Sequence, residues 1–305
     1  MITRTIQTLL LAGAFAGLVS LSACGKGGNP NDYPVSHWLE DGEDCTRAAA
    51  AAIIKSGLPF PNFGTDETPS TASGVPPTKR IKTVDMWLGP TRFVIPAQVA
   101  SSYGAYPEHH PRRYQGMRGS LPNFYPPGPP GPEIDGMGSM VDVSFDCSMD
   151  EKYAAFWGKG YRSNAEGIEK VKAQYEADAA RSDATRPVPS RITVNKRDDI
   201  GMTEVLYERG RGTYTDGMPM WEASYWPISG ELKGLDGSVS EVRCKARHDA
   251  ADHRYGKVGW RCTSSLGLTP NATANIQIYV THIQQMPAIY EQVKQLLVNA
   301  QQSSK

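Results

Sequence analysis

The stretch from residue 239 to residue 265 reads VSEVRCKARHDAADHRYGKVGWRCTSS. Apolar residues alternate with polar ones at both of its ends: Val242, Cys244 and Ala246 near the start, and Val258, Trp260 and Cys262 near the finish. Alternation with a period of two is typical of strands that bury one face. Because a hydrophilic segment separates the two strands, the stretch predicts a β-hairpin.

The hairpin lies within a longer run of strand candidates that are separated by turn residues. They are Ile192–Lys196, Thr203–Glu208, Met220–Ile228, Val239–Arg247, Lys257–Ser265 and Ile276–Ile283. Strands in this succession predict an antiparallel, meander-like sheet. Helical spacing precedes them from Ser163 to about Arg181, with a capping box formed by Ser163 and Glu166, and follows them from Pro287 to about Asn299. Residues 161–305 are therefore expected to form an α+β unit, closed by a C-terminal helix packed on the sheet.

Residues 37–160 are expected to form a smaller α+β unit. A helix is predicted from about Cys45 to Ser56, where an alanine run follows Asp44 as the capping residue. Three strand candidates follow: Ile81–Trp87 and Arg92–Pro96 around the turn Gly89-Pro90, and a third in which Val141, Val143 and Phe145 alternate toward Cys147. The predicted fold class is α+β in two units, each with a helix and an antiparallel sheet.

Residues 98–138 show no periodicity and combine many prolines with aromatic and arginine side chains. Long structureless loops in compact domains are usually functional or disordered, and so many aromatic residues do not suit disorder. Tyrosine and arginine are enriched in protein-binding hot spots. The candidate partner-binding residues are Tyr106, Arg112, Arg113, Tyr114, Arg118, Phe124 and Tyr125. The alternative interpretation is a polyproline-like crossover that covers one face of the sheet.

The first residues of the chain have the order of a secretory signal peptide. Arg4 precedes an uncharged apolar core, and small residues then lead to Leu21-Ser22-Ala23-Cys24. These four residues resemble the lipobox of bacterial lipoproteins. The resemblance implies removal of residues 1–23, lipidation of Cys24 and, since Gly25 follows, an outer-membrane position facing the periplasm. Residues 24–36 then serve as a flexible tether.

Four further cysteines remain in the exported chain: Cys45, Cys147, Cys244 and Cys262. An even number in an oxidising compartment indicates two disulfides, for which three connectivities are possible. The predicted hairpin favours Cys244–Cys262, which leaves Cys45–Cys147. Zinc ligation is the alternative, but the cysteines do not have the close spacing of a zinc knuckle.

The composition gives no sign of nucleic-acid binding, because 32 basic residues balance 32 acidic ones. The sequence carries no Walker loop, no G-x-G-x-x-G, no H-E-x-x-H and no G-x-S-x-G elbow, so neither a cofactor nor an enzyme activity is predicted. His248, Asp249, Asp252 and His253 could hold a metal ion or supply a general base. A hydrophilic hairpin tip needs the same residue types, and no metal site is predicted.

The chain also resembles, in outline, lipoprotein immunity proteins that neutralise type VI secretion effectors. The resemblance rests on the lipobox, two α+β units and the stretch from Trp87 to Pro96, WLGPTRFVIP. It implies a membrane-anchored binding protein that occludes a protein partner, such as a secreted lipase or another toxin. Two alternatives stay open: an envelope-assembly or structural lipoprotein, and a periplasmic hydrolase with an unfamiliar site.

Overall fold

The structure is a computed structural model, and it describes residues 44–56, 83–102, 114–124, 139–149, 160–183, 189–208, 221–245 and 261–302. All of these belong to the unit that spans residues 34–305. The signal peptide, Cys24 and most of the tether lie outside that unit, and all of them lie outside the described residues. Their roles therefore stay predictions.

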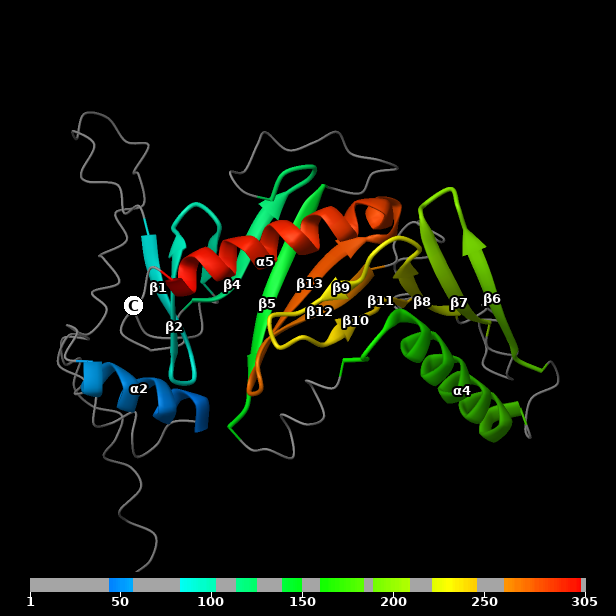
Figure 1. Cartoon of the computed structure of the whole chain (residues 1–305), viewed down its shortest axis with the longest axis horizontal. Helices are drawn as coiled ribbons and strands as arrows, with labels where there is room; N and C mark the ends of the chain where they lie inside the picture. Colours follow the sequence, from blue (N-terminus) through cyan, green and yellow to red (C-terminus); the bar gives the residue numbers. More distant parts are fainter. Residues whose placement is uncertain are drawn as a thin grey trace, which may run out of the picture. The chain divides into compact units, whose positions relative to one another are not determined.

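The predicted hairpin forms two neighbouring strands near the middle of a nine-stranded antiparallel sheet (Figure 1). β11 (Val242–Lys245) pairs with β12 (Arg261–Thr269), and Cys244 lies directly opposite Cys262. The two sulfur atoms are bonded, with an Sγ–Sγ distance of 1.99 Å, which agrees with the predicted pairing. The tip, with His248 and His253, lies outside the described residues.

The remaining strands extend the sheet on both sides of this hairpin. In spatial order the sheet is β3 (Ala100–Ser102), β4 (Tyr114–Ser120), β5 (Met140–Cys147), β13 (Ala272–Tyr279), β12, β11, β8 (Trp221–Pro227), β7 (Met202–Glu208) and β6 (Arg191–Arg197). Every neighbouring pair is antiparallel. The antiparallel α+β class with a C-terminal helix is confirmed.

Strands from the two predicted units pair with each other. β5 belongs to residues 37–160, β13 belongs to residues 161–305, and they pair over Asp142–Cys147 and Ala272–Gln277. Their interior side chains enter the same apolar cluster as those of β8 and β11. The predicted boundary near residue 160 therefore does not separate two sheets.

Two further details of the strand prediction are corrected. β13 begins at Ala272 and ends at Tyr279, and the predicted continuation to Ile283 is the 3₁₀ helix η4 (Val280–Gln285). Residues 98–138 were expected to be irregular, yet β3 and β4 lie within them. β4 was missed because its sequence, YQGMRGS, offers one aliphatic side chain and two glycines instead of an alternating apolar pattern.

One face of the sheet is apolar and packs against α5 (Met286–Gln302) and a two-stranded hairpin. α5 buries its predicted stripe, which includes Ile289, Tyr290, Val293, Leu296 and Leu297. The hairpin consists of β1 (Thr83–Leu88) and β2 (Thr91–Pro96). Its turn starts at Gly89 with a φ of 57°, and Pro90 follows, which suits a type II′ turn. Phe93 and Ile95 from β2 enter the same core as α5.

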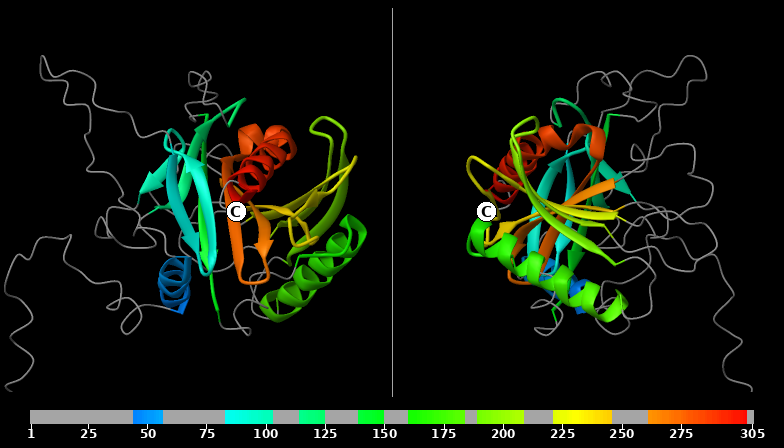
Figure 2. Two further views of the ribbon diagram at one scale, coloured as in Figure 1. Left: turned by 60° about the vertical axis from the view of Figure 1, so that its left-hand side comes forward. Right: turned by 90° about the vertical axis from the view of Figure 1, so that its right-hand side faces the viewer.

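The opposite face carries α4 (Asn164–Asp183) over β6, β7 and β8, so that α4 and α5 lie on opposite sides of the strands (Figure 2). The backbone N–H of Glu166 donates to Ser163 Oγ at 3.2 Å, as the capping box predicts. The Glu166 carboxylate accepts instead from the backbone N–H of Arg162, at 2.7 Å. Val171, Tyr175 and Ala179 pack against Val205, Tyr207 and Trp226.

The first helix, α2 (Asp44–Ser56), packs on the β1–β2 hairpin through Ala49, Ile53 and Trp87. A disulfide between Cys45 and Cys147 links α2 to the end of β5, with an Sγ–Sγ distance of 2.05 Å. This is the second pairing favoured by the sequence. The two disulfides therefore have different structural roles. Cys244–Cys262 links the neighbouring strands β11 and β12, and Cys45–Cys147 attaches α2 to the sheet.

Candidate functional site

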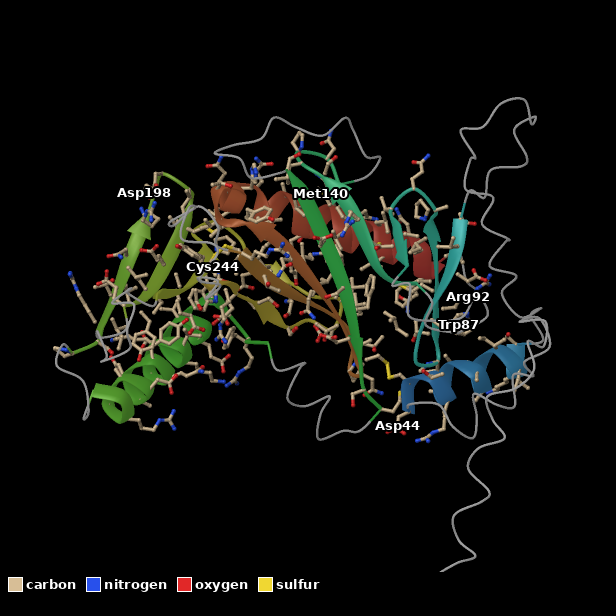
Figure 3. All side chains as sticks on the ribbon, turned by 180° about the vertical axis from the view of Figure 1, so that it is seen from behind. Asp44, Trp87, Arg92, Met140, Asp198 and Cys244 are labelled. Carbon is tan, nitrogen blue, oxygen red and sulfur yellow. A yellow bond between two sulfur atoms is a disulfide. The ribbon has the colours of Figure 1, made fainter. Side chains whose placement is uncertain are left out.

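The sheet carries a polar face on the side opposite to α5, between β4 and β11 (Figure 3). Strand registers place one row of side chains side by side across it: Arg118, Asp142, Gln277, Thr263 and Arg243. Further side chains of the same face are Ser144, Asp146, Arg261, Ser265, Thr273, Asn275 and Tyr279. We call these twelve residues the polar face.

The sequences of β12 and β13 explain why this face is polar. In β12 the inward positions are Cys262, Ser264 and Leu266, whereas Thr263 and Ser265 point to the other side. β13 alternates in the same way, with Ala274, Ile276 and Ile278 buried and Asn275, Gln277 and Tyr279 half-buried. Because side chains alternate along a strand, a polar residue at every second position produces one continuous polar surface.

Hydrogen bonds between strands hold the side chains of the polar face in place. Arg118 Nε donates to Asp142 Oδ1 at 2.7 Å, across β4 and β5. Asn275 Nδ2 donates to Asp146 Oδ2 at 2.6 Å, and Ser265 Oγ donates to Asn275 Oδ1 at 2.8 Å. The chain of contacts from Asp146 to Ser265 thus crosses β5, β13 and β12.

Arg261, Gln277 and Tyr279 contact one another on this face. The Arg261 guanidinium donates from Nη1 to Gln277 Oε1 at 2.9 Å and from Nη2 to Tyr279 Oη at 3.3 Å. The guanidinium carbon lies 5.3 Å from the centroid of the Tyr279 ring. These contacts restrict the half-buried side chains of Arg261 and Tyr279 before any partner binds. Binding a partner there would therefore cost little additional side-chain conformational entropy.

A cavity of about 230 Å³ opens at the end of the polar face. It lies where the chain entering α4 meets the short ribbon of β9 (Leu232–Lys233) and β10 (Val239–Ser240). Tyr161 and Val239 exchange two backbone hydrogen bonds of 2.7 Å, which fix this crossing. The lining residues are Gly160, Tyr161, Ser238, Val239, Ser240, Glu241, Arg243, Thr263, Ser265, Gly267 and Thr273.

Arg243 is the basic residue of the cavity wall, and carboxylates surround it. Its Nη2 lies 2.9 Å from Glu241 Oε1, and its Nε lies 3.8 Å from Glu222 Oε1. Burial, together with the nearby Glu241 carboxylate, raises the pKa of Tyr161 to about 12. The phenol therefore stays neutral at physiological pH and can both donate and accept a hydrogen bond.

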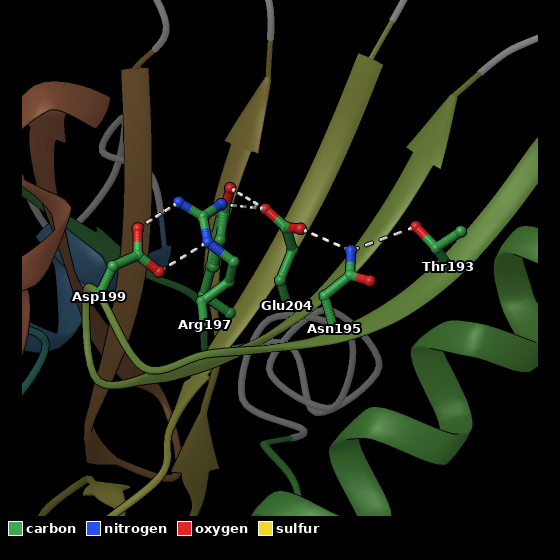
Figure 4. Close-up of polar contacts among 6 residues, drawn as sticks. Thr193, Asn195, Arg197, Asp199 and Glu204 are labelled. Carbon is green, nitrogen blue, oxygen red and sulfur yellow. Dashed lines mark hydrogen bonds and ion pairs between the residues drawn. The ribbon is translucent and has the colours of Figure 1, made fainter.

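A second polar group, on the other face of the sheet at β6–β8, is structural (Figure 4). Glu204 is 6% exposed and accepts hydrogen bonds from Tyr225 Oη at 2.8 Å and Asn195 Nδ2 at 2.9 Å. Arg197 lies between Glu204 and Asp199, donating to both Asp199 oxygens at 2.8 and 2.6 Å. Because these carboxylates already have partners, the group stabilises the edge hairpin of β6 and β7.

The residues that the sequence analysis proposed as partner-binding lie in different parts of the structure. Arg118 belongs to the polar face and its side chain is 58% exposed. Phe124 is completely buried in the apolar core, and its backbone N–H donates to Gln292 Oε1 at 2.8 Å, so its predicted role as a binding anchor is wrong. Tyr114 begins β4. Tyr106, Arg112, Arg113 and Tyr125 lie outside the described residues.

Arg261, Gln277 and Tyr279 were not found by sequence reasoning. Arg261 and Tyr279 stand 18 positions apart and become neighbours only through the register of β12 and β13. The signal present in the sequence is the run of polar residues at alternate positions in both strands, which indicates that the second face of this part of the sheet is polar.

Two findings concern only the described part of the chain. Within it, no three histidine, cysteine, aspartate or glutamate side chains lie close enough together to hold a metal ion. Within the same residues, none of the helices is long and apolar enough to cross a membrane.

The chain matches no protein-family model and no curated protein. Among solved structures, it is similar to an immunity protein of the Stenotrophomonas maltophilia type IV secretion system, with 13% sequence identity and a TM-score of 0.39. The likeness covers 76% of this chain and 99% of that one.

Proposed function

We propose that the protein is a non-enzymatic binding protein that occludes a protein partner with its polar face, and that the partner is a secreted toxin. The observation that carries the proposal is the ordered group of Arg261, Gln277 and Tyr279, half-buried and already hydrogen-bonded. Arginine and tyrosine dominate binding hot spots. Holding them in place beforehand lowers the entropy lost on association.

The dimensions of the polar face suit a protein partner better than a small molecule. The polar face spans five strands spaced by about 4.8 Å, and each strand contributes several residues along its length. These two dimensions give a surface of roughly 400 Å². A standard interface buries about 800 Å² on each partner. The polar face can therefore supply the centre of such an interface, with neighbouring loops completing its rim.

The proposal includes an anchored position at the outer membrane, facing the periplasm. It is supported by the lipobox residues 21–24 and by two disulfides, which persist in oxidising compartments. Acyl chains on Cys24 would hold the protein without a membrane-spanning helix. Replacing Cys24 with alanine should abolish labelling by a palmitate analogue in cells, and normal labelling of that variant would refute the anchor.

Partner capture tests the proposed function. The purified protein is used as bait in lysate from the producing strain, and the captured partner is then titrated against variants. The double variant Arg261→Ala/Tyr279→Ala should weaken affinity at least thirtyfold, because one true hot-spot residue is worth about 2 kcal/mol or more. Arg191→Ala, an exposed position on the edge strand β6 and away from the polar face, is the matched control.

Protection in cells provides the second readout. Cells carrying the control variant should survive exposure to the toxin, whereas cells carrying the double variant should not. Full protection and unchanged affinity in the double variant, with melting temperature unaffected, would show that the partner binds elsewhere or that the protein has another function.

A further inference from the structure

The 3₁₀ helix η4 (Val280–Gln285), which joins β13 to α5, buries a histidine. His282 is 2% exposed, and within the described part of the chain neither Nδ1 nor Nε2 has a hydrogen-bond partner. A neutral imidazole has one donor and one acceptor, so both are unsatisfied. A protonated imidazole in the same place would bury two donors and a positive charge, which costs more.

Two further side chains of η4 also have unsatisfied polar atoms. Among the described residues, the buried atoms Thr281 Oγ1 and Gln285 Oε1 have no hydrogen-bond partner, so neither accepts a bond from His282. Such groups cost stability, and the hydrogen bonds of a 3₁₀ helix have poorer geometry than those of an α-helix. Packing holds η4 in place, because Ile283 is buried in the apolar core. We therefore expect η4 to open locally more readily than the strands before it.

Among the described residues, no carboxylate stabilises a positive charge on His282. The elements packed against η4 are β12, β13 and α5. Their titratable groups are Arg261, Tyr279, Tyr290, Glu291 and Lys294. Arg261 donates to Tyr279 on the polar face, and Glu291 accepts from Lys294 at 2.7 Å. Burial lowers the pKa of His282, and no neighbouring charge offsets that effect within the described part of the chain.

From these observations we propose that η4 is an acid-sensitive switch, in which proton uptake by His282 opens η4 and weakens binding at the polar face. Tyr279 directly precedes η4 and accepts a hydrogen bond of 3.3 Å from Arg261. Opening of η4 releases the end of β13 and with it the Arg261–Tyr279 contact. The opening rests on η4 alone, whereas its effect on binding rests on the proposed function.

The direction of the pH dependence follows from the burial of His282. Its folded pKa lies below the value of about 6.5 that an exposed histidine has, so the opened segment binds more protons in acid. The stability that the neutral imidazole gives to η4 is complete above pH 6.5 and is lost as the pH falls below it. Between pH 7.5 and pH 5.5 the opening equilibrium should rise several-fold, and at most about tenfold, because one proton is taken up.

Hydrogen exchange of the whole protein, purified in detergent, tests the opening. Protection factors are compared at pH 7.5 and pH 5.5, since they already correct for the pH dependence of intrinsic exchange. Carboxylates with ordinary pKa values of about 4 stay charged throughout this range. Peptides covering residues 279–286 should lose protection several-fold in acid, whereas peptides from β7 should not.

Variants locate the titrating group. His282→Phe keeps an aromatic ring that cannot take up a proton, so the loss of protection in acid should disappear. His282→Gln, also neutral at both pH values, is the second variant in case the phenylalanine disturbs packing. His109→Gln/His110→Gln removes two histidines that lie outside the described residues and is the matched control, which should respond as wild type does.

No loss of protection in wild type, or an equal loss in both His282 variants, would overturn the switch. The captured partner is then titrated at both pH values, and acid should weaken wild-type affinity several-fold but leave that of His282→Phe unchanged. An equal weakening in the two proteins would overturn the link between η4 and binding. If exchange behaves as expected but Arg261→Ala/Tyr279→Ala binds the partner as wild type does, the proposed function fails and the acid-sensitive opening stands.

Discussion

At the scale of single residues, the hydrogen bonds of Glu166 make the stability of the fold depend on pH. Its carboxylate lies 2.7 Å from Lys170 Nζ and accepts from the backbone N–H of Arg162 at 2.7 Å. The Lys170 hydrogen bond first, and then that of Arg162, lower the pKa of Glu166 to about 2. A carboxyl whose folded pKa is depressed stabilises the fold above its unfolded pKa, and that contribution is lost as the pH falls toward the folded value.

Glu166→Gln should therefore lower the free energy of unfolding near neutral pH. The difference from wild type should shrink as the pH falls from about 4 toward 2, where the wild-type carboxylate is protonated as well. Urea unfolding at several pH values measures it, with Glu176→Gln, a more exposed carboxylate on the same helix, as the control. A difference that does not change with pH would mean that Glu166 acts only as a hydrogen-bond acceptor.

At the scale of elements, what the sequence could predict depended on how cleanly polarity alternates. β11 and β12 were recognisable because Val242, Cys244 and Cys262 fall on one face. β4 was not, because Gly116 and Gly119 interrupt any pattern. Gly119 is needed there, since a Cβ atom on it would stand 2.4 Å from the ring of Phe124. A glycine that is required by packing against a buried ring does not contribute to the alternation of apolar and polar residues, so that alternation cannot reveal it.

The candidate site was less predictable than the elements that form it. Residue type suggested that tyrosine and arginine would bind a partner, but residues 98–138 contain a core residue, Phe124, the edge strand β3 and its neighbour β4. The ordered pair is Arg261 and Tyr279, whose contact depends on strand register. β12 ends at Thr269 and β13 begins at Ala272, so the position of this short turn sets their register. The expected strands ended at Ser265 and began at Ile276, which left the turn unplaced.

The two disulfides make a prediction at this same scale. Cys244 and Cys262 are separated by 18 positions, and Cys45 and Cys147 by 102. In the chain-entropy model, removing the first cross-link costs about 3 kcal/mol and removing the second about 4.7 kcal/mol. Paired Cys→Ala variants, compared by urea unfolding, should show the larger loss for Cys45 and Cys147. A larger loss of stability for the Cys244 and Cys262 variant would mean that this disulfide also stabilises the native sheet directly.

At the scale of the whole molecule, one sheet joins both halves of the sequence. Arg118 and Asp142 of the polar face come from the first half, and Gln277, Thr263 and Arg243 come from the second. The proposed binding surface therefore exists only when β5 and β13 are paired. Stability of the two halves should be coupled in the same way, because their apolar side chains share one core.

Phe145→Ala tests this coupling. Phe145 lies on β5, is 3% exposed and stands opposite Ala274 of β13. Truncating a buried phenylalanine costs about 3–5 kcal/mol. If the sheet unfolds as one unit, hydrogen exchange should lose protection by the same free energy in peptides from β1–β2 and from β8–β11. Val194→Ala, at a side chain 47% exposed on β6, serves as the control and should change neither. Loss confined to peptides before residue 160 would contradict a single cooperative sheet and restore two independent units.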